Sequence, residues 1–177
     1  MEALKTDLEA IRKRARDNIQ EGAVTAAYEA DTAKIVAVLN EVLATELVCV
    51  LRYKHHYYMA KGIHAKPVAA EFLEHANEEM GHADSVAKRI TELGGKPNFN
   101  PDGLHTRSHA EYREGNTLEE MIKEDLIAER IAIDSYKEII DYLGDKDTTT
   151  RRMFEEILAV EEEHADDLVS LLGGFPK

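Results

Sequence analysis

Two segments of the sequence carry the residue types and the spacing of a metal site. Glu79–His82 and Glu161–His164 both have the pattern Glu-x-x-His, so each would place a carboxylate and an imidazole about one turn apart on one helix face. One such pair is weak evidence, because the chain is rich in glutamate and holds eight histidines. The two segments therefore need support from the rest of the chain.

That support is a repeat along the chain. Glu46 precedes Glu79 by 33 positions, and Glu129 precedes Glu161 by 32 positions. A glutamate followed at nearly the same distance by Glu-x-x-His thus occurs twice, once in each half of the chain. The repeat predicts a site built from two similar halves.

Long amphipathic helices must position these residues, and almost nothing in the sequence is typical of a strand. Glycines, prolines and capping signals predict helices over residues 31–62, 67–93, 117–144 and 148–172, after a shorter helix that starts near Leu4 and stops at Gly22. Thr117–Glu120 has the form of a capping box. Long helices of about 25 to 30 residues would each span roughly 40 Å, which is typical of a four-helix bundle.

The connections predict how these helices are arranged. His64–Pro67 and Gly144–Asp147 are short links and indicate antiparallel neighbours, whereas residues 94–116 form a long one. A loop of that length in a compact domain usually crosses along the bundle. We therefore expect an all-α antiparallel four-helix bundle over residues 31–173, with a long crossover between its second and third helices. Residues 1–30 would form an N-terminal helical extension.

Each predicted long helix places a carboxylate in the stripe that should be buried. The four stripes are Ile35, Leu39, Val42, Glu46, Cys49 and Tyr53; Phe72, Ala76, Glu79, Ala83, Val86, Ile90 and Leu93; Ile122, Asp125, Glu129, Ala132, Tyr136 and Ile139; and Ile157, Glu161, His164, Leu168 and Leu171. An unpaired buried charge costs several kcal/mol or forces its own protonation. No Lys or Arg lies in any stripe, so metal cations are the natural partners.

The donor set indicates which metals would bind. Four carboxylates offset the charge of two divalent ions, and two neutral imidazoles complete the ligand set without adding charge. Carboxylate and imidazole together suit iron or manganese better than calcium, and the sequence does not choose between these two metals. The single cysteine, Cys49, excludes a four-cysteine zinc or rubredoxin-type site, and we expect it to be a small buried hydrophobe.

Four segments resemble, in order, the four helices of the bacterioferritin family within the ferritin-like superfamily. They are Leu39–Ala60, Glu78–Asp84, Glu124–Tyr136 and Glu155–Leu168. Single glutamates combined with Glu-x-x-His pairs form the di-iron carboxylate site of ferritin-like bundles. The resemblance implies a ferritin-like fold and a di-iron site whose ligands are Glu46, Glu79, His82, Glu129, Glu161 and His164. Glu79 and Glu161 match bridging positions, and Tyr53 matches a tyrosine near the metals.

The same resemblance implies an activity. The chain would be a ferroxidase that binds two iron ions per subunit and oxidises Fe(II) with O2 or hydrogen peroxide. It would store or detoxify the ferric product as a mineral within a homo-oligomeric shell, and so protect against oxidative stress. A di-metal redox enzyme that does not store iron, such as a peroxidase or a manganese catalase-like protein, is the alternative. A structural or DNA-compacting bundle would leave the four buried acids unexplained.

For several other residues the sequence allows two different roles. Met80 matches a methionine that binds haem at a subunit interface in bacterioferritins, or is ordinary apolar packing. Tyr53 and Tyr136 face inward, either as core residues with satisfied hydroxyls or as participants near the metals. Asp125 would be an acceptor behind Glu129 or an exposed residue at the edge of its stripe. The histidines without a motif are expected at the surface; they are His55, His56, His64, His75, His105 and His109, of which His105 and His109 could form a secondary iron site.

The two ends of the chain differ from bacterioferritins. About 30 residues precede the bundle, and Gly173–Lys177 follows Leu172, so we do not expect the short fifth helix of the 24-subunit shells. A shell of 12 subunits, as in Dps-like proteins that retain a bacterioferritin-type site, therefore fits better. The first helix and the long loop would be candidates for contact between subunits.

The composition of the chain argues against two classes of binding partner, nucleic acids and membranes. The net charge of −13 argues against nucleic-acid binding, and the basic run Ile11–Arg16 is balanced by nearby acids, so DNA binding is not expected. The sequence shows neither an apolar run long enough for a membrane span nor a signal-peptide core at its start. We therefore expect a cytoplasmic protein without membrane contact.

Overall fold

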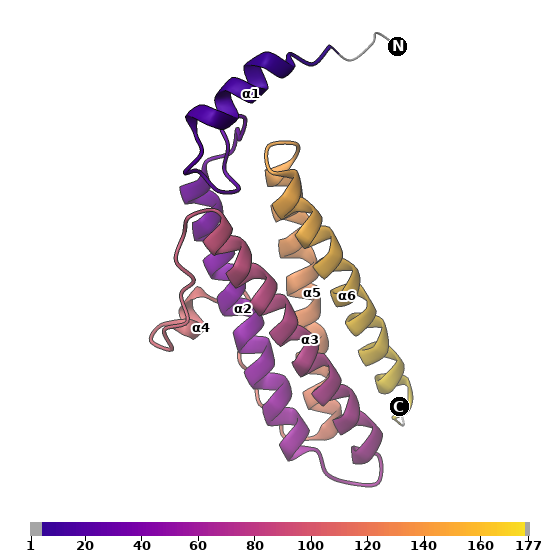
Figure 1. Ribbon diagram of the computed structural model, residues 1–177. Helices are drawn as coiled ribbons and strands as arrows, with labels where there is room; N and C mark the ends of the chain where they lie inside the picture. Colours follow the sequence, from indigo (N-terminus) through magenta and orange to yellow (C-terminus); the bar gives the residue numbers. More distant parts are fainter. Residues whose placement is uncertain (1–4, 176–177) are drawn as a thin grey trace.

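Long helices of the described chain, residues 5–175, run side by side as an antiparallel bundle in the computed structural model (Figure 1). Over this range the elements are α1 (Leu8–Asp17), α2 (Thr32–Met59), α3 (Ala65–Glu92), α4 (Leu104–Arg107), α5 (Leu118–Leu143) and α6 (Thr148–Gly173). The bundle consists of α2, α3, α5 and α6. Each of these helices begins and ends within three residues of its predicted bounds, so the expected fold class is confirmed.

Side-chain caps fix where three of the bundle helices begin. Asp31, Thr117 and Asp147 each accept a hydrogen bond from the backbone N–H three residues further on, at 3.2, 3.1 and 2.9 Å. The expected capping box is present in a shifted form, because the Glu120 carboxylate accepts from the N–H of Asn116, one residue before the cap, at 2.8 Å. Each contact satisfies an N–H that the helix itself leaves without a partner.

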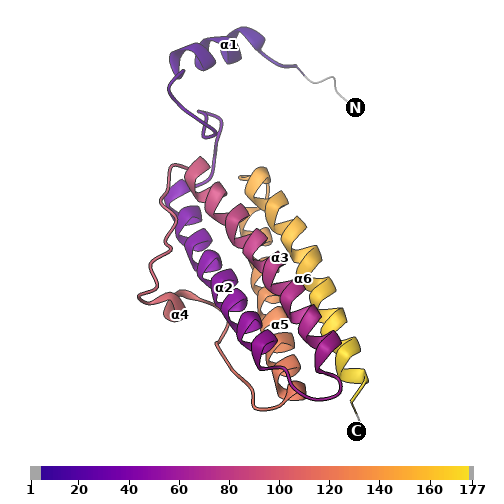
Figure 2. The ribbon, with the colours of Figure 1, turned by 60° about the horizontal axis from the view of Figure 1, so that its bottom comes forward.

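The long connection between α3 and α5 crosses along the bundle, as predicted. It contains the short helix α4, which packs against α2 (Figure 2). Two side chains of α2 hold it in place. Asn40 accepts from the N–H of Asn98 at 2.7 Å, and Thr45 accepts from the N–H of His109 at 2.9 Å. The pairs α2 with α3 and α5 with α6 are therefore hairpins joined by an anchored crossover.

The two larger apolar clusters of the core are separated by a polar layer. The cluster toward the start of α2 contains Leu39, Ile90 and Phe154, and the cluster toward its end contains Phe72 and Leu168; all five are fully buried. Burying a side chain of this size contributes about 1.5–3 kcal/mol relative to its exposed state. Between these clusters lies the level of the bundle that holds the predicted site residues.

The N-terminal helix α1 lies beyond one end of the bundle (Figure 1). Its predicted apolar stripe has no buried residue among those described: Leu8 is 55% exposed and Ile11 is 42% exposed. The predicted start of this helix at Leu4 lies outside the described residues. The segment after α1 behaves differently, because Val24 and Tyr28 pack on the bundle and the Tyr28 hydroxyl donates to Asp147 at 2.6 Å.

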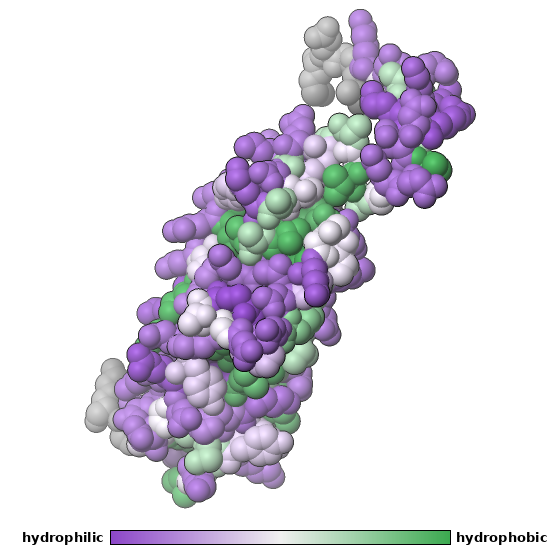
Figure 3. All heavy atoms as spheres, turned by 90° about the vertical axis from the view of Figure 1, so that its left-hand side faces the viewer, coloured by the Kyte–Doolittle hydropathy of each residue, from purple (hydrophilic) through white to green (hydrophobic). Residues whose placement is uncertain are grey.

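The surface is dominated by hydrophilic side chains. On the face drawn in Figure 3, apolar residues form separated green patches within a mainly purple surface, in keeping with a net charge of −13. Within residues 5–175, none of the helices combines the length and the apolar character needed to cross a bilayer.

Candidate metal centre

The six residues predicted as ligands meet in the middle of the bundle. Glu46 comes from α2, Glu79 and His82 from α3, Glu129 from α5, and Glu161 and His164 from α6. Their ligand atoms form two overlapping groups in which all atoms lie within 4.8 Å of one another. One group is Glu46, Glu79, His82 and Glu161, and the other is Glu79, Glu129, Glu161 and His164. Glu79 and Glu161 belong to both groups, which is the geometry of shared ligands between two ions.

The centre is closed off from solvent. All four glutamates are at most 1% exposed, and the side chains of His164 and His82 are 2% and 12% exposed. Carboxylates at this depth are unfavourable unless a cation or a proton compensates them.

Each of the six residues also has one buried polar atom that lacks a hydrogen-bond partner within the described part of the chain. These atoms are Glu46 Oε2, Glu79 Oε1, His82 Nδ1, Glu129 Oε2, Glu161 Oε2 and His164 Nδ1. Buried polar atoms in native proteins almost always have partners, so an orphan in every member of one cluster requires a common cause. Divalent cations bound between these atoms satisfy all of them together. The donor set therefore fits two metal ions.

The spacing of the atoms agrees with coordination. His82 Nδ1 lies 3.2 Å from Glu161 and 3.6 Å from Glu79, and His164 Nδ1 lies 3.3 Å from Glu161 and 3.6 Å from Glu79. Ligand atoms about 2.1 Å from a shared ion and roughly at right angles are about 3 Å apart. The site is thus close to the dimensions that bound ions require.

Burial and neighbouring charges shift the pKa values of several ligand residues. Burial and the Glu79 carboxylate raise the pKa of both Glu46 and Glu129 well above the usual range. Burial alone would lower the pKa of His164, but the nearby carboxylates of Glu161 and Glu79 outweigh burial and raise this pKa to about 11. Metal ions must therefore displace protons from the centre.

Two buried tyrosines orient the outer glutamates. The Tyr53 hydroxyl of α2 donates to Glu129 of α5, and the Tyr136 hydroxyl of α5 donates to Glu46 of α2. Both tyrosines are 0% exposed, as expected for inward residues with satisfied hydroxyls. The sequence already contains a signal that the two tyrosines play the same part, because each follows the glutamate of its own helix by seven residues.

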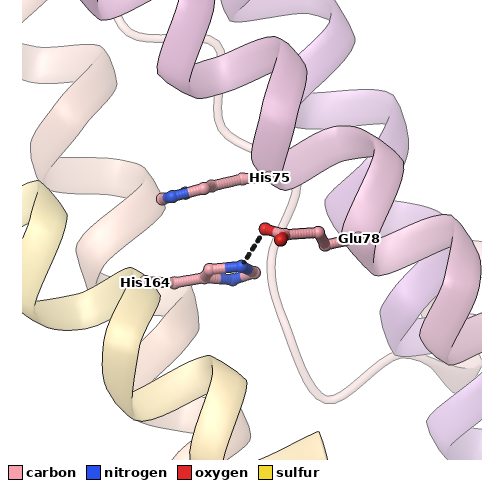
Figure 4. Close-up of side chains that lie close together, drawn as sticks. All are labelled: His75, Glu78 and His164. Carbon is pink, nitrogen blue, oxygen red and sulfur yellow. Dashed lines mark hydrogen bonds and ion pairs between the residues drawn. The ribbon is translucent and has the colours of Figure 1, made fainter.

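One imidazole has an outer partner that fixes its orientation. His164 Nε2 lies 2.8 Å from Glu78 Oε2, and the His75 ring stacks on the His164 ring at 3.9 Å between centroids (Figure 4). An outer carboxylate that accepts from Nε2 leaves Nδ1 free to bind metal. Nδ1 is the atom of His164 that faces Glu79 and Glu161.

Two surface assignments made from the sequence are wrong. His56 and His75 are 0% and 2% exposed. His75 belongs to the surroundings of the metal centre, while His56 Nδ1 lies 2.8 Å from Asp125. Neither residue is part of a Glu-x-x-His segment, and that is why the pattern did not identify them.

No stripe contains a Lys or Arg, as the sequence indicated, but a basic residue from beside a stripe pairs with the buried Asp125, so the alternative that Asp125 is exposed is wrong. Arg52 is fully buried, and its Nε donates to Asp125 at 2.7 Å. Arg52 also donates to the carbonyl oxygen of Glu111 at 3.1 Å, and His56 Nε2 lies 3.1 Å from that of Arg113. Asp125 is therefore a buried acceptor that ties the crossover to the bundle. Its charge is balanced without metal.

The remaining candidates stay apart from the centre. Met80 is 39% exposed beside the buried Glu79, and its role as a haem ligand stays a prediction. Cys49 is buried against Ala110 and Ala128, which confirms its expected place in the core. His105 is exposed and His109 lies 3.5 Å from Glu41, so the described residues do not join the two histidines in one site.

The fold and the centre define a class of protein. The family model for the ferritin-like domain matches residues 36–177, so the chain belongs to the ferritin-like family. Its relatives include bacterioferritins. The one from Rhodobacter capsulatus is 33% identical over 138 residues, which are 77% of this chain and 81% of the relative. The one from Brucella melitensis is 34% identical over 142 residues, covering 78% and 83% of the two chains.

Solved structures agree with this membership. A dodecameric thioferritin, described as a bacterioferritin-related protein from Bacteroides fragilis, is 32% identical, with a TM-score of 0.77 and coverage of 81% of this chain and 86% of the other. BfrA from Mycobacterium tuberculosis is 31% identical, with a TM-score of 0.70 and coverage of 80% and 84%. Dps from Thermosynechococcus elongatus, at 20% identity, a TM-score of 0.76 and coverage of 79% and 90%, shares the fold.

Proposed function

We propose that this protein is a ferroxidase that oxidises Fe(II) with O2 or hydrogen peroxide and stores the ferric product within a homo-oligomeric shell. The observation that carries the proposal is the set of six buried atoms without hydrogen-bond partners, one from each predicted ligand, at the middle of a ferritin-like bundle. The curated relatives are named bacterioferritins, which supports iron as the metal.

The six predicted ligands would bind two ions between them. Glu46 and His82 would hold one ion, Glu129 and His164 the other, and the carboxylates of Glu79 and Glu161 would bridge them. When bound, two Fe(II) ions supply one electron each to the oxidant. The chain supplies four carboxylates that offset the charge of both ions, and its two buried tyrosines hold the outer glutamates in place.

The shell is the second part of the proposal, and we favour 12 subunits over 24. The Bacteroides fragilis relative is described as dodecameric. Helices of this bundle also leave large apolar side chains uncovered, including Leu51 at 53% and Ile127 at 50% exposed. Such residues are suited to contacts between copies of the chain. A cytoplasmic location and a role against oxidative stress belong to the proposal as well.

A loading experiment tests oxidation and storage together. The purified protein would be sized by exclusion chromatography and then given increasing Fe(II) in air, with oxidation followed by absorbance and iron measured per subunit. A 12-subunit particle that takes up many irons per subunit is the expected result. A small oligomer that binds only two metals per subunit would instead favour the non-storage redox enzyme, whose ligand set accepts manganese equally well.

A matched pair of variants tests the site. Glu79→Ala should oxidise Fe(II) far more slowly than the wild type, whereas Glu163→Ala removes an exposed carboxylate near the same level of the bundle and should have no effect. Equal rates for Glu79→Ala and the wild type would remove the assignment of the centre.

A further inference from the structure

The N-terminal segment of the described chain has two parts that differ in how they meet the bundle. Residues 24–30 are fixed to it. Val24 and Tyr28 pack on the apolar core, the Tyr28 hydroxyl donates to Asp147 at 2.6 Å, and Arg89 donates to the same carboxylate at 3.0 Å. The helix α1, by contrast, lies beyond the end of the bundle and contains no buried residue (Figures 1 and 2). The chain therefore carries α1 past its own bundle from a fixed base.

The apolar stripe of α1 is left open by the described chain. Leu8 and Ile11 are 55% and 42% exposed, and Ile19, which continues the stripe after the helix, is 76% exposed. Ile11, Ala15 and Ile19 line one side of a hollow of about 440 Å³, and residues 25–27 line the other. A hollow of this size is in the range of sites that bind other molecules. It can therefore receive side chains from another surface.

The short length of α1 also calls for a covering surface. The helix has 10 residues, and isolated helices of this length are marginal in water. Its local support is an Asp7 cap, which accepts from the N–H of Ala10 at 3.0 Å, and an exposed ion pair between Arg12 and Glu9. Exposed pairs of this kind contribute little. Packing of the amphipathic face would supply the stability that these contacts do not.

The charge of α1 indicates what the covering surface is. Four basic and two acidic side chains give the helix a net charge of +2, whereas the whole chain carries −13, so the remaining residues together carry −15. The six are Arg12, Lys13, Arg14, Arg16, Glu9 and Asp17. Opposite charges favour the association of two surfaces. The strongly acidic remainder of the chain repels nucleic acids and anionic membranes, and a second α1 would repel the first.

The exposed face of α5 has the features that α1 lacks. Ile127 and Tyr142 are 50% and 55% exposed. Helical spacing places both on one face with three exposed carboxylates, which are Asp134, Glu138 and Asp141. The neighbouring Lys137 pairs with Glu162 of α6, at 3.1 Å, and not with these three acids. This face therefore combines uncovered apolar side chains with negative charge.

We infer that α1 is an arm that docks on the exposed face of α5 in a second copy of this chain. The apolar stripe of α1 would cover Ile127 and Tyr142, and Arg12 and Arg14, on either side of the stripe, would lie near the acids of α5. The inference deepens the homo-oligomer of the proposed function, on which it rests, by naming the two surfaces that meet.

Photochemical cross-linking of the assembled full-length protein tests the contact. Ile11→Cys would be labelled with a benzophenone maleimide, which should spare the buried Cys49, and then illuminated. We expect a product of twice the chain mass on a denaturing gel, with the cross-link in residues 127–142 of the second chain. Lys13→Cys places the label on the opposite face of α1 and is the matched control, which should give far less of this product. Cross-links within one chain, or to a segment of the second chain other than α5, would overturn the inference.

Charge reversal tests the stated complementarity. Adding Arg12→Glu and Arg14→Glu to the labelled Ile11→Cys chain should lower the yield of the double-mass product by about tenfold. Further addition of Asp134→Lys and Glu138→Lys restores opposite charges and should recover the product. An unchanged yield after the first reversal would overturn the inference.

Two further measurements separate the inference from its alternatives. Sedimentation with vesicles of anionic phospholipid and a gel shift with duplex DNA should both be negative; binding that is lost on Ile11→Asn would assign α1 to a different partner and overturn the inference. Size-exclusion chromatography of the labelled protein distinguishes the two proposals. A monomer would contradict the shell, whereas an oligomer without the α5 cross-link would contradict only the arm, since α1 contains none of the six predicted metal ligands.

Discussion

The two halves of the metal centre share their inner residues and differ in what lies behind them. Glu46, Tyr53 and His82 recur 82 or 83 positions later as Glu129, Tyr136 and His164. Behind His164, Glu78 accepts from Nε2 and His75 stacks on the ring. Behind His82, by contrast, the residues of the described chain offer no hydrogen-bond partner to Nε2.

The sequence encodes this difference at two positions. Glu78 lies one residue before Glu79, and His75 lies four residues before Glu79. The residues at the corresponding positions before Glu161 are Val160 and Ile157. A repeat can thus keep the same ligands in both halves while the residues around them diverge. The His164 half is the more enclosed, with 2% of that side chain exposed against 12% for His82. We expect it to bind its ion more tightly.

The largest effect should come from removing a residue that both halves share. Glu79→Ala takes a ligand from each ion, so Fe(II) oxidation should fall by roughly 100-fold or more, since even outer partners of metal ligands are worth 10- to 100-fold. Glu46→Ala and Glu129→Ala each take a ligand from one half and should leave one ion bound. Stopped-flow oxidation and bound metal per subunit measure these effects. Equal metal loss in all three variants would contradict the idea of separate halves.

Changes of pH should act on both halves together. The pKa values of Glu46 and Glu129 are raised by burial and by the Glu79 carboxylate, and that of His164 is raised to about 11, so the metal-free centre holds protons to higher pH than free carboxyl and imidazole groups do. Because metal must displace those protons, affinity should rise with pH, by about tenfold per unit for each proton released. Zn²⁺ titrations from pH 6 to 8 in buffers of different ionisation enthalpy measure both quantities. An affinity that falls with rising pH would exclude protonation of the metal-free ligands.

Glu78→Gln should separate the halves. It weakens the acceptor that orients His164, so the ion of the His164 half should bind about tenfold more weakly, while the ion of the His82 half is unchanged. Two-step Co²⁺ titration followed by visible absorption resolves the ions. Glu74→Gln, an exposed change on the same helix, is the matched control. If both steps weaken equally, the outer partner does not distinguish the halves.

The smallest difference should appear between the two tyrosines. Tyr53→Phe and Tyr136→Phe each leave a buried carboxylate oxygen without its donor, which should destabilise the metal-free protein by about 1–3 kcal/mol. Tyr53→Phe also removes the hydrogen-bond partner of His75 Nδ1 and should cost about 1 kcal/mol more. Thermal unfolding at one fixed protein concentration compares them, because the Tm of an oligomer depends on concentration. A larger loss for Tyr136→Phe would reverse the comparison.

Helix periodicity predicted the bundle and the resemblance predicted the six converging residues, because both depend on local spacing along helices. The sequence did not show that Arg52 reaches Asp125, since Arg52 lies beside its stripe and its long side chain finds a partner on another helix. His75 was missed although it lies four residues before Glu79, on the same helix face. The apolar stripe of α1 predicted a helix correctly. Spacing along one helix does not show which surface would cover that stripe, and the stripe is exposed among the described residues.

The cluster of Arg52, His56 and Asp125 has a consequence for protein engineering. Surface loops usually tolerate inserted sequence. Here, residues 111 and 113 of the crossover provide the carbonyl oxygens next to a buried guanidinium and a buried imidazole. A peptide inserted between residues 109 and 113 would withdraw those oxygens and leave buried donors unsatisfied. The exposed turn at residues 61–64, between α2 and α3, does not provide these carbonyl oxygens. It is therefore the better place to display a foreign epitope.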